Sequence, residues 1–289
     1  MRVDYSDEQV RLAVYHLFDT SFDRLSTRIA LAESVGAVWH EVSTAFVDFI
    51  GDVAVSHVGV IEIPMVVAGV QRTVAGVHAV CTRPGHRGQG RSNAVLGEAL
   101  RHIDDRYDLA VLATEIPGFY EPFGFRVVEE SLFEVPRASA GAASKAVRAI
   151  EASDPDDLDL AYTLLRERQP VSNVFASLDP GWLFLIDEVL TSWGLRRLHF
   201  APELDAILAY EVRNGTLCLL DIVAREIPPL DAVLKCIPDP FERVTLLFTP
   251  DRVWDGELLL LPSDPSDRLM VRGDFPVREP CALTPLARC

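Results

Sequence analysis

The spacing of apolar residues changes along the first half of the chain. Residues 7–19 repeat apolar side chains every three or four positions, as an amphipathic helix does, and residues 39–49 are also expected to be helical. Val- and Ile-rich runs bounded by Gly, Pro or polar residues follow, which is typical of successive strands. These strands are expected at 53–63, 65–71, 73–82, 109–114 and from 124 onward, with a helix over 92–105.

The second half repeats this order coarsely. Strands are expected at 146–150, 197–200, 206–212, 216–224 and 244–249, with helices beginning near 154–157 and covering 182–193 and 230–236. Asn214-Gly215 is a strong hairpin signal between two of these strands. The segment from 262 onward, rich in Pro and Asp, gives no clear assignment.

A break in apolar content suggests two domains. Residues 136–144 contain no large apolar side chain, and a chain of 289 residues is long enough for two cores at about 100–200 residues each. We therefore expect an α/β (α+β) protein with domains at 1–136 and 145–289, joined by a linker at 137–144. Each domain is predicted to hold a mixed, mostly antiparallel central sheet flanked by helices.

Composition narrows the classes of partner. The net charge is −16, from 43 acidic and 27 basic residues, which disfavours nucleic-acid binding and favours a cationic ligand, unless the acids serve solubility alone. Five widely spaced cysteines indicate neither a disulfide framework nor a metal site. No apolar run is long enough for a membrane span, and the polar N-terminus resembles no signal peptide, so a cytoplasmic location is expected.

The segment 77–92 carries the most informative chemistry. It is expected to run from a strand through a glycine-rich loop into the start of a helix. Gly88 and Gly90 permit backbone conformations closed to other residues, and a helix N-terminus favours an anion. Arg87 and Arg91 add positive charge, so the loop suits a pyrophosphate.

Other interpretations of this loop fit less well. A Walker-type loop requires Lys followed by Ser or Thr, and neither pair is present. A dinucleotide-binding loop follows the first strand of a parallel unit, whereas this loop follows several strands. An arginine-bearing turn without a ligand remains the alternative.

The loop resembles the signature of the GCN5-related N-acetyltransferases (GNAT). That signature, Arg/Gln-x-x-Gly-x-Gly/Ala, reads here Arg87-Gly88-Gln89-Gly90-Arg91-Ser92, with Ser in the last position. A second family pattern, an aromatic residue and Tyr followed by Gly-Phe, is found at residues 118–125. The two patterns occur in the family's order, so the resemblance implies tandem GNAT-like domains.

Within this family the chain looks most like the Eis-type acetyltransferases. The similarity lies in the Pro-x-His-Arg run at 84–87, in the Tyr-x-x-Phe-Gly-Phe run at 120–125, and in a second domain without a phosphate loop. Members of that group carry a third, sterol-carrier-like domain, for which this chain has no room. That difference puts the group's substrate range in doubt here.

The resemblance implies roles for residues of the first domain. Backbone N–H groups of residues 87–92 would anchor acetyl-CoA, and Val80, Cys81 and Thr82 would pair with its pantetheine arm. The N–H of Val80 would polarise the thioester carbonyl, and Tyr120 would act as the general acid. Cys81 lacks a His/Asp partner for a covalent acyl-enzyme, so direct transfer is expected.

The general base and the acceptor pocket stay open. Relatives carry a glutamate at a position that is Val74 here. His78 has a suitable ordinary pKa and shares a strand face with Val80 by alternation, although a lone strand histidine is more often a packing residue. Glu62 and Glu115 are further candidates, and in Eis-like enzymes the terminal carboxylate serves, here that of Cys289. Around the acceptor, Trp39 and Glu41 could receive a cation, or Trp39 could simply pack inward.

The sequence thus predicts an acyltransferase that moves an acetyl group from acetyl-CoA to a primary amine of a small molecule or a lysine side chain, without a metal. The second domain would be a degenerate copy that shapes the pocket or an oligomer interface. A non-catalytic acyl-CoA-binding regulator is one alternative. A tandem acyltransferase of small-molecule biosynthesis, similar to mycothiol synthase, is the other, although there the second domain carries the working loop.

Overall fold

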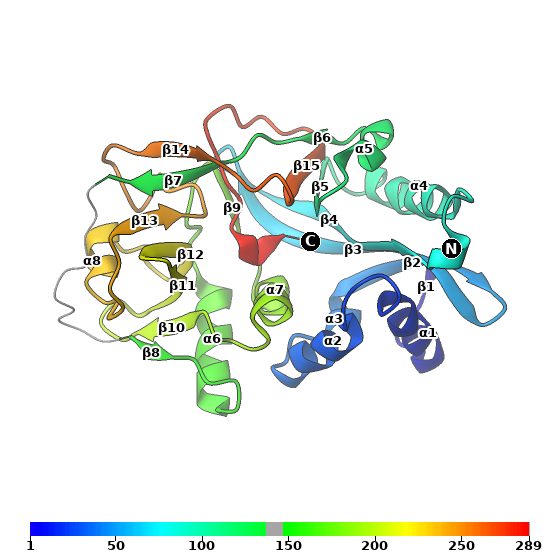
Figure 1. Cartoon of the computed structure of the whole chain (residues 1–289), viewed down its shortest axis with the longest axis horizontal. Helices are drawn as coiled ribbons and strands as arrows, with labels where there is room; N and C mark the ends of the chain where they lie inside the picture. Colours follow the sequence, from blue (N-terminus) through cyan, green and yellow to red (C-terminus); the bar gives the residue numbers. More distant parts are fainter. Residues whose placement is uncertain (137–146, 289) are drawn as a thin grey trace.

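The computed structural model describes residues 1–136 and 147–288. The predicted linker, 137–144, and Cys289 lie outside the described residues. Two sheets lie side by side along the long axis of the molecule (Figure 1). Their described strands pair antiparallel except for one parallel pair in each sheet, β4–β5 and β12–β13. The predicted fold class is confirmed.

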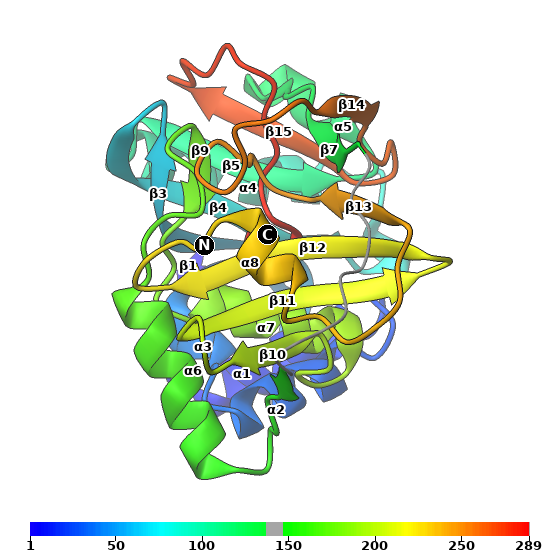
Figure 2. The ribbon, with the colours of Figure 1, turned by 90° about the vertical axis from the view of Figure 1, so that its left-hand side faces the viewer.

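The first sheet is built mainly from the N-terminal half. Its strand order is β1 (Arg2–Val3), β2 (Ser43–Ile50), β3 (Val53–Val67), β4 (Val70–Thr82), β5 (Leu109–Thr114), β15 (Arg268–Gly273) and β6 (Arg126–Val127), and β9 (Phe175–Ser177) pairs with β3. The second sheet runs β14 (Leu259–Pro262), β7 (Ser131–Val135), β13 (Arg243–Leu246), β12 (Thr216–Ala224), β11 (Ala206–Arg213), β10 (Leu198–Ala201) and β8 (Arg148–Ala149), as Figure 2 shows face-on.

Helices cover both sheets and join them. The helices α1 (Glu8–Phe18), α2 (Leu25–Ser34), α6 (Pro155–Glu167) and α7 (Trp182–Ser192) share one apolar core with residues of both sheets. The opposite face of the first sheet packs against α4 (Arg91–Asp104), followed by α5 (Pro117–Tyr120), and α8 (Leu230–Leu234) packs on the second sheet. The short helices are α3 (Trp39–Val42), η1 (Pro84–His86), η2 (Glu121–Phe123) and η3 (Pro285–Ala287).

The two halves exchange a strand. β7 leaves the first half and inserts between β13 and β14, while β15 returns from the second half and inserts between β5 and β6. All six positions of β15 pair with β5, from Arg268 with Thr114 to Gly273 with Leu109. The predicted division at 137–144 therefore separates segments of sequence, but the first sheet contains β9 and β15 from the second segment, and the second sheet contains β7 from the first.

Two local predictions were wrong. Residues 39–49 form a single turn of helix, α3, and then β2, because the run from Ser43 buries Ala45 and Val47 on one face of the sheet and Phe46 on the other, and it pairs with β3 along its whole length. The two strands expected at 53–63 and 65–71 are one strand, since β3 continues through Pro64 to Val67 and turns at residues 68–69. Within the described residues, no helix is long and apolar enough to cross a membrane.

Candidate active site

The two parallel strands of the first sheet separate at one end. β4 and β5 are paired at two positions, and Gly76 with Val111 is the last of them. Both strands continue beyond this point, β4 to Thr82 and β5 to Thr114. Their separation leaves a V-shaped opening whose two sides carry backbone groups that no longer pair with each other.

A β-bulge shapes the β4 side of this opening. In the pairing of β3 with β4, Cys81 lies opposite His57 while His78 lies opposite Gly59, so β4 contains one extra residue. Ala79 within the bulge has φ +49°. Such a residue pays a backbone penalty of about 1–2 kcal/mol, and the surrounding structure must hold it in place.

A buried hydrogen-bonded pair holds the bulge. The ring Nδ1 of His57 lies 2.8 Å from the carbonyl oxygen of Ala79, and its Nε2 lies 2.7 Å from the hydroxyl of Tyr5. Because a carbonyl can only accept, Nδ1 carries the proton and Nε2 accepts from Tyr5. Burial lowers the pKa of His57 to about 4, so this arrangement persists in the neutral ring at physiological pH.

The glycine-rich loop lies between β4 and α4. Gly88 and Gly90 adopt φ +71° and +75°, and a Cβ on either would meet no atom within 4 Å, so the requirement for glycine there is conformational. Gly90 caps α4 without a side-chain hydrogen bond, which leaves the first-turn N–H groups available to an anion. Arg87 donates from Nε to the carbonyl of Thr82 at 2.9 Å, whereas Arg91 pairs with Asp48 at 2.5 Å.

A cavity fills the opening between loop and strands. It is lined by residues from four segments: Ser21, Phe22, Val80, Cys81, Thr82, Arg87, Ser92, Glu115, Ile116, Phe119 and Tyr120. Tyr120 is buried against the rings of Phe119 and Phe125. Burial raises the pKa of Tyr120 to about 12, a hydrogen bond with Thr114 acting in the opposite direction, so its hydroxyl keeps its proton at neutral pH.

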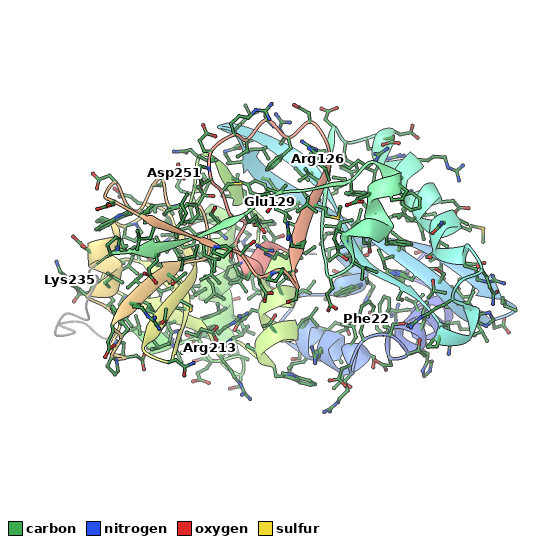
Figure 3. All side chains as sticks on the ribbon, turned by 45° about the horizontal axis from the view of Figure 1, so that its top comes forward. Phe22, Arg126, Glu129, Arg213, Lys235 and Asp251 are labelled. Atoms are coloured by element: carbon green, nitrogen blue, oxygen red, sulfur yellow. The ribbon has the colours of Figure 1, made fainter. Side chains whose placement is uncertain are left out.

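Two further cavities adjoin the first. The middle cavity shares Val80, Glu115 and Tyr120 with it and adds His78 and Ala79. The third, which we call the inter-sheet cavity, lies between the first sheet and α7, the helix that packs against both sheets, and no described strand of the second sheet lines it. It shares Phe22 with both other cavities and His78 and Ala79 with the middle one, and it extends to Arg288. Phe22, on the segment between α1 and α2, is labelled in Figure 3 beside the N-terminal helices.

This combination of bulge, splayed strands, glycine loop and buried tyrosine occurs in a stretch that matches a known family. Residues 4–128 match the sequence model of the acetyltransferase (GNAT) domain. This part of the chain is a GNAT acetyltransferase domain. The family and enzyme class expected from the sequence are thereby confirmed, and acetyl-CoA is the co-substrate that goes with them. None of the curated proteins matches the chain in sequence.

Solved structures resemble the chain over 94% of its length. A probable N-acyltransferase from Enterococcus faecalis is 14% identical with a TM-score of 0.58 over 72% of its own chain. A GCN5-related N-acetyltransferase from Kribbella flavida is 17% identical, with a TM-score of 0.57 over 70%. Eis1 from Mycobacterium abscessus is 15% identical, with a TM-score of 0.56 over 72%. At these identities the likeness concerns the fold, and it extends across both sheets.

The structure separates the base candidates of the acetyltransferase domain. His78 is buried, its Nε2 lies 2.9 Å from the Ser43 hydroxyl, and burial lowers its pKa to about 3. Gly59 makes room for this ring, because a Cβ there would lie 2.4 Å from it. Glu62 pairs with Tyr107 at 2.5 Å instead of facing the cavities, whereas Glu115 lines two of them.

On the acceptor side, Trp39 lines the inter-sheet cavity and meets the ring of His78 edge-on at 4.9 Å. Glu41 is exposed at the end of α3. Within the described residues, no group of three or more His, Cys, Asp or Glu side chains is arranged to hold a metal ion.

Sequence reasoning missed the residues that reach the site from distant positions. Tyr5, His57 and Phe22 belong to no motif, and the contact between Tyr5 and His57 joins residues 52 positions apart. One signal in the sequence pointed to the pair. His57 lies in a Val-rich strand that is expected to be buried, and a buried histidine ring needs hydrogen-bond partners.

Proposed function

We propose that the chain is an N-acetyltransferase that moves the acetyl group of acetyl-CoA to a primary amine of a small molecule or a lysine side chain. The observation that carries the proposal is the opening between β4 and β5, with the uncapped N-terminus of α4 beside it and Tyr120 on its wall. Acetyl-CoA bound in this opening would have the N–H groups at the start of α4 as donors to its phosphates and Tyr120 as an acid for its thioester sulfur.

The first cavity fits the co-substrate by its chemistry. The pyrophosphate belongs at the loop, where Gly88, Gln89 and Gly90 bring backbone N–H groups to the start of α4. The pantetheine arm has the shape and amides of an added strand, and it would pair along Val80–Thr82, where β5 has moved away. The bulge then directs the N–H of Val80 toward the thioester carbonyl, where oxyanion stabilisation is required.

In the transfer step, the neutral amine attacks the carbonyl carbon and forms the C–N bond. The C–S bond breaks, and Tyr120 gives its proton to the departing thiolate of CoA. The new amide nitrogen loses its extra proton, which returns Tyr120 to the phenol. The raised pKa of Tyr120 keeps the phenol protonated across the physiological range. Cys81 takes no covalent part, because burial raises the pKa of its thiol to about 12.

The amine reaches the carbonyl as the free base, so a group on the acceptor side removes its proton. We assign this role to Glu115, which is exposed at the end of β5 and lines both cavities that Tyr120 lines. His78 binds Ser43 and accepts a proton poorly at neutral pH, so we assign it to positioning the acceptor. The carboxylate of Cys289, implied by the Eis resemblance, is the competing base.

We further propose that the second domain is a degenerate copy that completes the acceptor cavity, and that the protein works in the cytoplasm. Residues 225–242, which connect its two parallel strands, contain no glycine. Its contribution to the cavity comes from α7, whose residues line the side facing Trp39.

The decisive experiment combines acetyl-CoA binding by calorimetry with colorimetric detection of thiol release against a panel of amines. Binding together with amine-dependent thiol release is expected. Binding without release for any amine would favour the regulatory alternative, and absence of binding would overturn the assignment of the loop. Glu115→Gln should lower kcat at pH 7 and lose less at pH 9, where more of the amine is already neutral, and His78→Gln is its comparison.

A further inference from the structure

The wall of the inter-sheet cavity is mostly apolar, although the chain as a whole is strongly acidic. Its volume, about 460 Å³, is within the range of small-molecule sites. Apolar side chains from both halves form most of its wall, among them Leu25, Trp39, Ile61, Leu183, Ile186 and Leu190. Two arginines and two aspartates, Arg28, Arg288, Asp23 and Asp187, complete the charged part of the wall.

Both arginines of the wall form ion pairs with aspartates or glutamates, although the buried Nε atom of each has no hydrogen-bond partner among the described residues. Arg28 pairs with Asp23 at 3.3 Å and lies over the ring of Trp193 at 4.6 Å. Arg288 pairs with Glu130 at 2.8 Å and with Asp267 at 3.1 Å. Little negative charge is therefore left to hold a second or third ammonium group inside this cavity.

The fourth charged residue, Asp187, is a poor anion. Its Oδ2 accepts the backbone N–H of Arg288 at 2.9 Å, and burial raises its pKa well above the ordinary range. A carboxyl group in this state offers a hydrogen bond to a polar substituent. It does not compensate the desolvation of a permanent cation.

From this wall we propose that the acceptor is a monoamine attached to an apolar alkyl or aryl body, and that polyamines and aminosugars are poor acceptors. The inference rests on the proposed function, because it places the acceptor in the inter-sheet cavity, which shares His78 and Ala79 with the middle cavity that Tyr120 lines. The amine faces the middle cavity, and the apolar body lies between Trp39 and α7.

The test measures kcat/KM for thiol release from acetyl-CoA with the full chain. Hexylamine, 2-phenylethylamine and tryptamine are compared with spermidine and kanamycin. We expect the apolar amines to exceed the polycations by about 10-fold or more, the discrimination that an apolar pocket supplies for a few methylene groups. Equal or higher kcat/KM for the polycations would overturn the inference while leaving the proposed function intact.

Two variants at Leu190 locate the discrimination. Leu190→Asp places a carboxylate in the cavity and should shift the ratio toward spermidine by about 10-fold. Thr191→Asp adds the same charge at an exposed position of the same helix and should leave the ratio unchanged. Equal shifts in both variants would show a surface effect and overturn the assignment.

If melting curves show that Leu190→Asp does not fold, Leu190→Phe replaces it. The larger ring reduces the cavity, so tryptamine should lose more kcat/KM than hexylamine. A change in the preferred acyl-CoA chain length, with amine preference unchanged, would show that the cavity holds the acyl chain and would overturn the inference. If neither set of amines releases thiol although acetyl-CoA binds, the proposed function fails together with it.

Discussion

The two parallel strand pairs of this protein share their topology, yet one opens and the other is filled. β4 and β5 in the first sheet correspond to β12 and β13 in the second, and each pair lies beside an antiparallel neighbour. The correspondence extends to the bulge. β12 carries one extra residue opposite Ala209–Tyr210, as β4 does opposite His57–Gly59.

In the second sheet, buried groups occupy the place where the strands separate. Arg168 pairs with Asp221 at 2.7 Å, both almost fully buried, and the N–H of Gln169 binds the carbonyl of Ala224 at 2.8 Å. The connection to β13 contains the five-residue helix α8, capped by Pro229, in place of a glycine loop and a long helix. The strand topology alone therefore produces the separation. A binding site also requires free N–H groups and the absence of a filling side chain.

The largest expected difference between the two sheets comes from removal of the proposed general acid. Tyr120→Phe should lower kcat by about 10²–10⁴-fold, the range for loss of a general acid, with little change in acetyl-CoA affinity. Tyr210→Phe removes a hydroxyl that binds Asp239 at 3.3 Å in the second sheet, and its kcat should stay at the wild-type value. Kinetics of thiol release measure both, and equal losses in the two variants would contradict the assigned roles.

Removal of the filling group tests the second sheet. Asp221→Ala leaves the buried Arg168 guanidinium without its partner, so the free energy of unfolding should fall by about 3–5 kcal/mol. Urea unfolding measures this change. Asp205→Ala, which removes one of two exposed partners of Arg225, should cost less than about 1 kcal/mol. A small effect at Asp221 would mean that the second separation is not closed by this pair.

Two glycines, Gly90 in the loop and Gly97 in α4, are expected to give smaller effects of opposite sign when they are replaced by alanine. Gly90→Ala forces a Cβ onto φ +75°, which costs about 1–2 kcal/mol, and it should weaken acetyl-CoA binding by about 5–30-fold if the loop opens to relieve the strain. Gly97→Ala lies inside α4, where nothing within 4 Å obstructs a Cβ, so it should stabilise the protein by about 0.5–1 kcal/mol. Calorimetry and thermal unfolding check the pair.

Local patterns explain what the sequence could predict. β5 and β12 begin and end at the residues expected, and α4 begins within one residue of its predicted start, because apolar spacing and bounding polar residues determine these elements. Motifs led to the loop and to Tyr120, and their roles stay predictions. Residues 39–49 were misassigned because Trp39 and Val42 fit a helical spacing, while the strand pairing of Ser43–Ile50 with β3 decides their conformation.

The features that the sequence could not predict depend on pairing between residues far apart in the chain. The insertion of β15 beside β5 joins residues more than 150 positions apart, and nothing in the sequence of residues 268–273 names its partner. The same applies to the inter-sheet cavity, whose wall combines α2, Trp39 and α7. Its apolar character depends on which side chains meet in space, so the acidic composition of the whole chain was a poor guide to it.

The smallest predicted effect concerns the bulge itself. Tyr5→Phe removes the hydroxyl that binds His57, which frees the ring to move and loosens its bond to the Ala79 carbonyl. Since the adjacent Val80 N–H is proposed to act on the thioester in the transition state, kcat should fall by about 3–10-fold while the KM for acetyl-CoA stays the same. Tyr107→Phe, which loses a hydroxyl bonded to the exposed Glu62, is the matched control and should leave kcat unchanged. A purely structural role for Tyr5 would lower the melting temperature and leave kcat of the folded enzyme intact. A lower kcat for folded Tyr5→Phe would show that the β4 bulge is held in place for catalysis. The β12 bulge, for which no ligand is proposed, has no such role.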